Sequence, residues 1–324
     1  MRPLTFQALR ALADGRFHSG EDVARALGRS RASLSEALGL ASGMGLQVFS
    51  VRGKGYRLAV PIEFLDAAAV MRAVGDPRVR LEVVDAIDST STRLLELAAA
   101  GAASGTCLAA EWQSAGRGRR GRTWVASLGG SLTFSLLWRF DRGAGHLGGL
   151  SLAVGLAVAR ALAACGVVRV QVKWPNDVVV DMRKVAGLLV ETSGEMQGPS
   201  VAVVGVGVNY RLPEAVVDQI DQPVVDVASS ADPVPGRGEL LAALLRELAG
   251  VLTVFERSGF AALREEWLAL HAFQGKRARV LPGREAPFDA DVVDVGADGS
   301  LHVRADDGRL LPLASAEISL RPRE

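Results

Sequence analysis

The sequence predicts an α+β protein with three parts: a small helical head, a central α/β unit on a mixed sheet, and a small C-terminal β-barrel. Three patterns carry this prediction. Residues 1–60 have helical spacing and an excess of positive charge, residues 81–208 alternate strand-like and helical runs, and residues 276–320 hold short strand-like runs between glycine-containing turns. At 324 residues the chain is long enough for about two domains of ~150 residues.

Composition excludes several classes of protein. With 49% hydrophobic and 23% charged residues, the chain is neither disordered nor collagen-like. Its two cysteines, Cys107 and Cys165, are too few for a disulfide framework or a structural zinc site, and we expect both to be buried thiols. The longest apolar run, 147–168, is interrupted by Arg160 and several glycines, so it predicts a buried helix rather than a membrane span.

Because no export signal is visible, we expect a cytoplasmic protein with no membrane partner.

Positive charge is concentrated in the head. Residues 1–60 contain nine basic and four acidic side chains, a net charge of +5, which leaves −4 for the rest of a chain whose total is +1. A basic module on a mildly acidic body predicts an anionic partner for that module.

The head has the spacing of three helices and a hairpin. A first helix is expected at 5–13, Ser19 is placed to cap a second helix, and Ser30 to cap a third. Apolar positions of the third helix share one face: Leu34, Leu38 and Ala41. Two strand-like runs, 46–51 and 56–58, follow around an Arg-Gly-Lys-Gly turn.

This layout predicts a winged helix-turn-helix over residues 1–62. In such a unit the second helix of the pair enters the major groove of DNA, and a basic hairpin contacts phosphates. The candidate DNA contacts are Ser30, Arg31, Ser33, Ser35, Arg52 and Lys54. A three-helix packing module without nucleic acid is the alternative, and Glu36 favours it because phosphates repel a carboxylate.

The body begins after a predicted connector, residues 63–80, which has prolines near both ends. Strand-like runs are expected at 81–87, 107–112, 132–138, 167–172, 178–180, 185–191 and 201–208. Helices are expected at 91–100, 150–164, 239–257 and 260–270, with a surface loop at 222–238. Several strands follow one another without room for a crossover helix, which predicts a mixed sheet.

The most distinctive segment is an arginine–glycine loop, GRGRRGR at 116–122, between two strand-like runs. Glycines let the backbone approach a ligand closely, and arginines supply fixed forks of donors. Such a loop suits a polyanion and predicts nucleotide binding, although its spacing is not that of a Walker A loop. A disordered nucleic-acid tether is the alternative, which the closely flanking strands disfavour.

Three further segments place polar or small residues at strand ends: KWPND at 173–177, KVAG at 184–187 and GVGVN at 205–209. Asp177 suits a metal ion or an amine, and Lys184 suits a substrate carboxylate or the charge that develops on a phosphate. The glycine-rich run lets a flat ligand lie against the backbone. Taken singly, these residues are more typical of an Asn-Asp turn with a packed Trp, a solvated strand-end lysine and a glycine-rich strand end than of a site.

Together, and in this order, the segments resemble the biotin protein ligases. The matching motifs are Asp88-Ser89-Thr90, the run from Glu111 to Trp124 that contains the arginine–glycine loop, KWPND, KVAG and GVGVN. FHSGE at 17–21 and GKGY at 53–56 resemble the DNA-binding head of the bifunctional members, the biotin operon repressors, and EISLR at 317–321 resembles their SH3-like C-terminal barrel. The resemblance covers essentially the whole chain. Lipoate-attaching enzymes share the catalytic fold, but this set of motifs favours biotin.

The resemblance implies a two-step ligase reaction. The carboxylate of biotin attacks the α-phosphate of ATP, giving biotinyl-5′-AMP and pyrophosphate, and a lysine of a biotin carboxyl carrier protein then attacks the mixed anhydride. It assigns residues 81–271 to a catalytic domain that binds biotin and ATP, and residues 272–324 to the barrel. Mg²⁺ is implied as a further cofactor, with Asp177 near it, because a triphosphate needs charge neutralisation.

The resemblance also implies the residues of the site. The catalytic residues are Arg119, Lys184 and Asp177. The biotin-binding residues are Ser89, Thr90, Ser91, Gln113, Gly116, Arg117, Arg119, Lys184, Gly187 and Gly205. The ATP- and adenylate-binding residues are Arg117, Arg119, Arg120, Arg122, Trp124, Lys173, Asn176, Asp177 and Asn209. Cations at the junction would remove the repulsion between two anions that must react.

The implied partners are a biotin carboxyl carrier protein of acetyl-CoA carboxylase, operator DNA, and a second copy of the chain when biotinyl-AMP is bound. Two alternatives stay open. One is a ligase with a vestigial DNA-binding head, which Glu36 favours. The other is a repressor that uses biotinyl-AMP only as a corepressor, which the intact Arg119, Asp177 and Lys184 disfavour.

Overall fold

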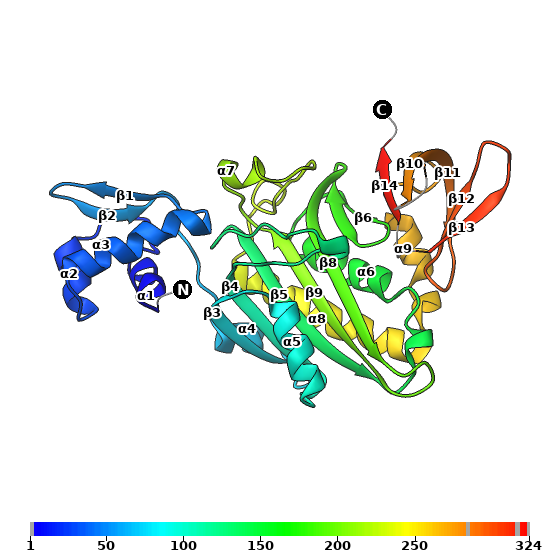
Figure 1. Cartoon of the computed structure of the whole chain (residues 1–324), viewed down its shortest axis with the longest axis horizontal. Coiled ribbons are helices and arrows are strands. Elements are labelled where there is room, and N and C mark those ends of the chain that lie inside the picture. Colours follow the sequence, from blue (N-terminus) through cyan, green and yellow to red (C-terminus); the bar gives the residue numbers. More distant parts are fainter. Residues whose placement is uncertain (1–2, 283–285, 315–317, 323–324) are drawn as a thin grey trace.

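The computed structural model describes residues 3–282, 286–314 and 318–322. Three regions follow one another along the long axis: the head, the central sheet with its helices, and the C-terminal sheet (Figure 1). The head and the C-terminal sheet lie at opposite ends (Figure 1). The central region therefore contacts both of the others.

The head consists of three helices and a hairpin: α1 (Pro3–Ala11), α2 (Gly20–Ala26), α3 (Arg31–Gly39), a 3₁₀ turn η1 (Leu40–Met44), β1 (Val48–Val51) and β2 (Gly55–Leu58). Both predicted caps are confirmed. The Ser19 hydroxyl accepts a hydrogen bond from the Asp22 amide, and this caps α2. The Ser30 hydroxyl caps α3 in the same way, accepting from the Ser33 amide at 3.1 Å. The predicted apolar positions are all buried: Leu34, Leu38 and Ala41.

The predicted connector, residues 63–80, contains a helix that the sequence analysis did not predict, α4 (Ala67–Val74). Asp66 caps it. Val70 and Val74, one turn apart, bury their side chains in the main core. The prolines that suggested a linker lie outside this helix.

The central sheet has seven strands in the order β3-β4-β5-β9-β8-β7-β6. Their bounds are β3 (Arg80–Ile87), β4 (Thr106–Gln113), β5 (Ser131–Phe140), β6 (Val170–Lys173), β7 (Asp177–Val180), β8 (Arg183–Gly194) and β9 (Ser200–Asn209). β3 and β4 pair in parallel, and the other neighbouring pairs of this sheet are antiparallel. The mixed sheet that the sequence predicts is therefore confirmed.

Helices cover the two faces of this sheet unequally. The long helices α6 (Leu150–Ala164) and α8 (Arg237–Ser258) pack together on one face, over the main core (Figure 1). On the other face α5 (Thr90–Ala99) packs against β4, β5 and β9. The remaining helical segments are η2 (Arg119–Gly121), η3 (Ala144–His146), α7 (Glu214–Val217), η4 (Phe260–Ala262) and α9 (Arg264–Leu270).

The apolar run at 147–168 contains the buried helix α6, as predicted. None of the helices in the part of the chain that the structure describes is long and apolar enough to cross a bilayer. Cys107 is buried as expected, whereas Cys165 is partly exposed because it lies at the C-terminal end of α6.

A fully buried ion pair ties the connector to the central sheet. Glu111 on β4 and Arg237 at the start of α8 lie 2.8 Å apart, and both side chains are 0% exposed. Glu111 also accepts a hydrogen bond from the Leu65 amide at 2.5 Å. Arg237 also donates to the backbone carbonyls of Glu63 and Ser131. Several hydrogen bonds thus compensate each buried charge, which such a pair requires.

The C-terminal strands form a second sheet in the order β13-β12-β11-β10-β14. Their bounds are β10 (Arg277–Pro282), β11 (Phe288–Val295), β12 (Leu301–Arg304), β13 (Leu310–Leu313) and β14 (Ile318–Pro322). Over the described residues, β13 and β14 are the two edges of an open sheet, so a closed barrel is not confirmed. Glu317 of the tail motif lies outside the described residues.

The head packs on the segment 125–130, which directly follows the arginine–glycine loop. Leu128 is 1% exposed, belongs to the core of the head, and donates its amide hydrogen to the Met44 carbonyl at 3.0 Å. Arg10 of α1 also forms an ion pair with Asp85 on β3 at 2.5 Å. The two regions therefore share an apolar contact and a polar one.

His271 lies where the central region meets the C-terminal sheet. Its ring is 4% exposed and its centroid lies 4.5 Å from that of Trp267. Burial lowers the pKa of His271 to about 4.

We therefore expect acid to destabilise the fold through His271. Above pH 6.5 the ring is neutral in both states, but between pH 6.5 and 4 only the unfolded chain takes up the proton. The free energy of unfolding should fall over this range by up to about 3 kcal/mol from this residue alone. Urea denaturation at several pH values should show a shallower pH dependence for His271→Phe than for the wild type. His146→Gln, which changes an exposed histidine, should keep the wild-type slope, and equal slopes for all three proteins would contradict this prediction.

Candidate functional site

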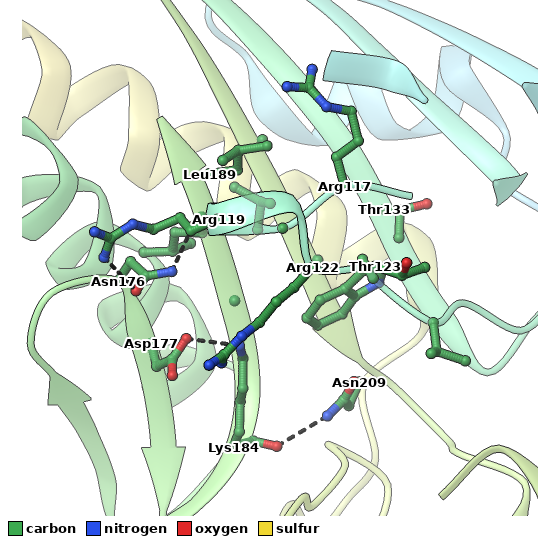
Figure 2. Close-up of a pocket in the computed structure, with 18 of the residues that line it drawn as sticks. Arg117, Arg119, Arg122, Thr123, Thr133, Asn176, Asp177, Lys184, Leu189 and Asn209 are labelled. Atoms are coloured by element: carbon green, nitrogen blue, oxygen red, sulfur yellow. Dashed lines mark hydrogen bonds and ion pairs between the residues drawn. The ribbon is translucent and has the colours of Figure 1, made fainter. Parts of the chain in front are cut away.

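A cavity of about 410 Å³ lies on the face of the central sheet that α5 leaves partly uncovered. Its walls come from the first turn of α5, the arginine–glycine loop, the start of β7 and β8, and the segment 219–224. Figure 2 shows the charged side chains that enter it from the loop and from β7 and β8.

The floor of the cavity is backbone, because glycines lie at facing positions of β8 and β9. Gly187 pairs directly with Gly207, and the Trp124 indole lies on both. A Cβ at position 207 would come within 2.4 Å of the indole, and one at position 187 within 2.9 Å. A Cβ at Gly205 would lie 2.5 Å from the Ser91 hydroxyl. Side chains at these positions would fill the space that the indole and the hydroxyl occupy.

One end of the cavity carries a network of uncharged polar groups at the start of α5. The backbone amide and the hydroxyl of Thr90 both donate to the side-chain oxygen of Gln113, at 2.7 and 3.0 Å. Ser135 on β5 lies 2.8 Å from the Thr90 hydroxyl and 3.0 Å from that of Ser91. Because the Gln113 oxygen already accepts two bonds, the side-chain amide group of this residue is left as a donor for a ligand.

The other end is cationic. Lys184 forms an ion pair with Asp177 at 2.8 Å, and both side chains are mostly buried. Arg119 donates to the side-chain oxygen of Asn176 at 3.1 Å. Burial lowers the pKa of Arg119, and the neighbouring positive charges of the loop act in the same direction. In Figure 2 the Arg122 side chain points toward the Asp177–Lys184 pair.

Arg117 points away from the Asp177–Lys184 pair, toward which Arg122 points (Figure 2). Its guanidinium group binds the Glu191 carboxylate through two hydrogen bonds, at 2.7 and 3.2 Å. Arg117 lines the cavity, but its charge is paired with Glu191, which lies further along β8 than Lys184.

The arginine–glycine loop is folded as a small hairpin and is not an extended tether. Gly118 donates to the Arg122 carbonyl at 2.7 Å, and Trp124 donates to the Gly116 carbonyl at 2.8 Å. Arg120 at the tip has φ 59°, a left-handed conformation that costs energy for a residue with a Cβ. The hairpin fixes the indole of Trp124 over the floor.

Asn209 at the end of β9 holds the segment that closes the cavity. Its side chain is buried, and its amide group donates to the Lys184 carbonyl at 3.0 Å and the Val225 carbonyl at 3.2 Å. Val225 in turn donates to the Lys184 carbonyl. Asn209 lines the cavity as predicted, but both of its donors are used by the backbone.

The structure brings nearly all of the predicted site residues together. Those that line the cavity are Ser89, Thr90, Ser91, Gln113, Arg117, Arg119, Arg120, Arg122, Trp124, Lys173, Asn176, Asp177, Lys184, Gly187, Gly205 and Asn209. Gly116 does not line it. This residue lies beside Gln113 and Trp124, and a Cβ there would come within 2.7 Å of the Trp124 carbonyl.

Other lining residues were missed by the sequence analysis. They include Thr123, Thr133, Leu189, Gln219, Ile220, Asp221 and Gln222. Thr133 shares a face of β5 with Ser135, and the alternation of small polar and large apolar residues along that strand is a signal that could have found both. Residues 219–222 lie in an irregular segment with no such pattern.

The candidate DNA contacts lie on the head, outside this cavity. Arg31, Ser35, Arg52 and Lys54 are exposed there. Ser30 and Ser33 bind each other at 3.0 Å in the cap of α3.

Metal ligands do not cluster in the described residues, where no three His, Cys, Asp or Glu side chains gather around one point. Asp177 and Asp221 are the acidic residues that line the cavity. Mg²⁺ commonly takes one or two carboxylates and completes its shell with phosphate oxygens and water. These carboxylates suit a metal ion that arrives with a nucleotide.

The comparisons with known proteins agree with this geometry. The model of the Biotin/lipoate A/B protein ligase family matches residues 83–209. The bifunctional ligase/repressor BirA of Escherichia coli is 37% identical over 99% of this chain and 98% of its own. The chain belongs to the biotin/lipoate ligase family.

Two further relatives lead to the same family. The biotin–[acetyl-CoA-carboxylase] ligase of Paracoccus denitrificans is 36% identical over 71% of this chain and 96% of its own. The structure of the Aquifex aeolicus biotin protein ligase in complex with biotin and ATP has a TM-score of 0.63 and 27% identity, and covers 75% of this chain and 99% of that one. The resemblance to biotin protein ligases that the motifs indicate is thus confirmed, and so is the mixed α+β fold of the family.

The role of Asn209 can be tested directly. Asn209→Ala removes two buried hydrogen bonds and should lower the free energy of unfolding by about 2 kcal/mol. Hydrogen exchange should become faster at the amides of Val225 and Val227, which lie in the segment that Asn209 holds. Thr192→Ala, an exposed change on β8, should leave these amides protected. Unchanged protection in Asn209→Ala would contradict the role assigned here.

Proposed function

We propose that this protein is a biotin protein ligase. It activates biotin with ATP to biotinyl-5′-AMP, with release of pyrophosphate, and transfers the biotinyl group to a lysine amine with release of AMP. The observation that carries this proposal is one cavity with an uncharged hydrogen-bonding end, a glycine floor and a cationic end, in a chain 37% identical over its whole length to a bifunctional ligase/repressor.

The uncharged end suits the ureido ring of biotin. Thr90, Ser91 and Ser135 offer hydroxyl groups, and the Gln113 amide is left as a donor. A neutral ring that both donates and accepts hydrogen bonds needs such a mixed set and no charge. Biotin bound there by its ring would extend its carboxylate along the glycine floor.

The cationic end suits the reacting carboxylate and phosphates. Arg119 and Lys184 would lie between two anions and lower the energy of the charge that develops as they react. Trp124 offers a flat surface for the adenine base, with the Lys184 ammonium 5.6 Å from its ring centre. Mg²⁺ held by phosphates and by Asp177 would neutralise further charge. Asp177 would also orient the acceptor amine, which must lose a proton before it attacks.

We propose the same division of the chain as the sequence predicts: a DNA-binding head at 1–62, a connector at 63–80, a catalytic domain at 81–271, and a C-terminal SH3-like domain at 272–324. The acceptor is a biotin carboxyl carrier protein. We propose that the ligase is cytoplasmic and forms a homodimer when biotinyl-AMP is bound.

The head supports a second activity, repression. We propose that it is a winged helix-turn-helix, with α3 in the major groove and the β1–β2 hairpin on phosphates. Arg57 supports the hairpin, since its guanidinium group lies 5.1 Å from the ring of Phe17 and 4.9 Å from that of Phe49. This leaves Arg52 and Lys54 exposed at the turn. A ligase with a vestigial head is the alternative, and binding to DNA decides between them.

Ligase activity is tested by the intact mass of a purified biotin carboxyl carrier domain after incubation with the protein, biotin and Mg-ATP. We expect a mass increase of one biotinyl group that requires ATP. Arg119→Ala or Lys184→Ala should slow it by roughly 100-fold or more, since each removes a charge from the reacting end. Arg72→Ala, an exposed change on α4, should keep the wild-type rate. A competent acceptor that gains no mass would contradict the proposal and favour a repressor that only senses biotinyl-AMP.

DNA binding is tested by fluorescence anisotropy on a duplex of mixed sequence over a range of salt concentrations. Replacing Arg52 and Lys54 by alanine should make the dependence of log affinity on log salt shallower by about 2 per protomer, since each phosphate contact contributes ~0.9. Arg25→Ala is the matched control, because Arg25 is also exposed but forms ion pairs with Glu21 and Asp22 on its own helix. Wild-type binding that is weak and insensitive to salt would favour the vestigial head.

A further inference from the structure

Trp174, within the KWPND segment, connects the cavity to the C-terminal sheet. Its side chain is 1% exposed, and its indole nitrogen donates to the Gly299 carbonyl at 3.1 Å. Gly299 lies 125 residues further along the chain, in the turn between β11 and β12. The hydrogen bond therefore joins the end of β6 to the C-terminal sheet, which lies beside α9 and β6 (Figure 1).

The turn that accepts this bond has its own hydrogen bonds and packs against the central region. Asp298 accepts hydrogen bonds from the amide and the hydroxyl of Ser300, at 3.0 and 2.7 Å. Gly299 has φ +82°, and a Cβ there would lie 2.5 Å from the Cα of Gly149 at the start of α6. Position 299 thus requires glycine for its conformation and for this close approach.

The rest of the segment is fixed from the same side. The Ser151 hydroxyl, in the first turn of α6, donates to the Pro175 carbonyl at 3.0 Å. The Ala272 amide donates to the Val172 carbonyl at 2.9 Å, so the chain that leads into the C-terminal sheet also binds β6. The first contact comes from α6, whose N-terminal Gly149 lies against Gly299, and the second comes from the segment that leads into the C-terminal sheet.

The two residues that follow Pro175 orient the cations of the site. Asn176 accepts from Arg119, and its own amide donates to the Leu188 carbonyl at 2.9 Å. Asp177 forms the ion pair with Lys184. A shift of the segment would therefore move both cations relative to the floor, while the hydroxyl network on α5 and β5 would stay in place.

We propose that the C-terminal sheet positions the cationic end of the cavity through the hydrogen bond between Trp174 and Gly299. The inference rests on the proposed ligase function. Trp174 and Gly299 are positioning residues, because the one polar atom of the Trp174 side chain is bonded to Gly299, and Gly299 does not line the cavity. Trp138 on β5 shows that burial alone does not demand such a bond, since it is 4% exposed and its indole nitrogen has no partner in the described part of the chain.

The test compares Trp174→Phe with Trp138→Phe in the full-length protein. Each change removes one buried indole, but only the first removes a hydrogen bond to the C-terminal sheet. We expect Trp174→Phe to slow biotin-dependent exchange of pyrophosphate into ATP roughly tenfold, because small displacements of reacting groups are costly. The Kd for biotin measured by calorimetry without nucleotide should change by a smaller factor than the exchange rate, since the polar network still holds the ring and only the carboxylate meets the displaced cations. Trp138→Phe should keep the wild-type exchange rate even where its thermal midpoint falls as far as that of Trp174→Phe.

Gly299→Ala provides a second route to the same contact. It should slow the exchange by a similar factor, and combining it with Trp174→Phe should add little, because both changes break one interaction. Equal exchange rates for Trp174→Phe and Trp138→Phe, or fully additive losses in the double variant, would overturn the inference while leaving the ligase proposal intact. A wild-type protein without biotin-dependent exchange would overturn the proposed function and this inference with it.

Discussion

The cavity depends on one constraint, which is that β8 and β9 carry no side chains where the Trp124 indole lies on them. Helices pack on both faces of the central sheet, so alternate side chains of a strand such as β9 pack against different helices. On β9, Val204, Val206 and Val208 enter the main core, while Val201 and Val203 pack with α5. Glycines at 205 and 207 continue the face of β9 that Val201 and Val203 begin, with Gly205 against Ser91 in the first turn of α5 and Gly207 against the Trp124 indole. On this face of β9, Val203 is the last residue of the apolar cluster and Gly205, two residues later, is the first of the floor.

The charges of the arginine–glycine loop are the second determinant. Four arginines within seven residues repel one another. Residues of the central region bind two of them. Arg117 binds Glu191 on β8, and Arg119 binds Asn176 before β7. Arg117 thus binds a carboxylate, whereas Arg119 binds a neutral side-chain amide and also feels the charge of Asp177. The ion pair between Arg117 and Glu191 holds the loop to β8.

Local signals in the sequence predicted much of this structure, and contacts between distant residues account for what was missed. The serine caps of α2 and α3, the strands and α6 follow from spacing within a few residues. The direction of Arg117 depends on Glu191, 74 residues away, and the donors of Asn209 are used by backbone carbonyls that no motif reveals. Helix α4 was missed because flanking prolines outweighed the spacing of Val70 and Val74. Gly116 was assigned to the ligand, although its small size serves the packing of Trp124.

Each end of the chain holds one of the two segments that shape the cavity. Leu128 follows Trp124 by four residues and is buried in the core of the head, so the loop that carries Arg119 and Arg122 is anchored at its C-terminal side by the N-terminal region. Trp174 precedes Asp177 by three residues and binds the C-terminal sheet. The glycine floor lies between these anchors and is fixed by the sheet itself. Packing of the terminal regions on the central one is thus part of how the polar groups of the cavity reach their places.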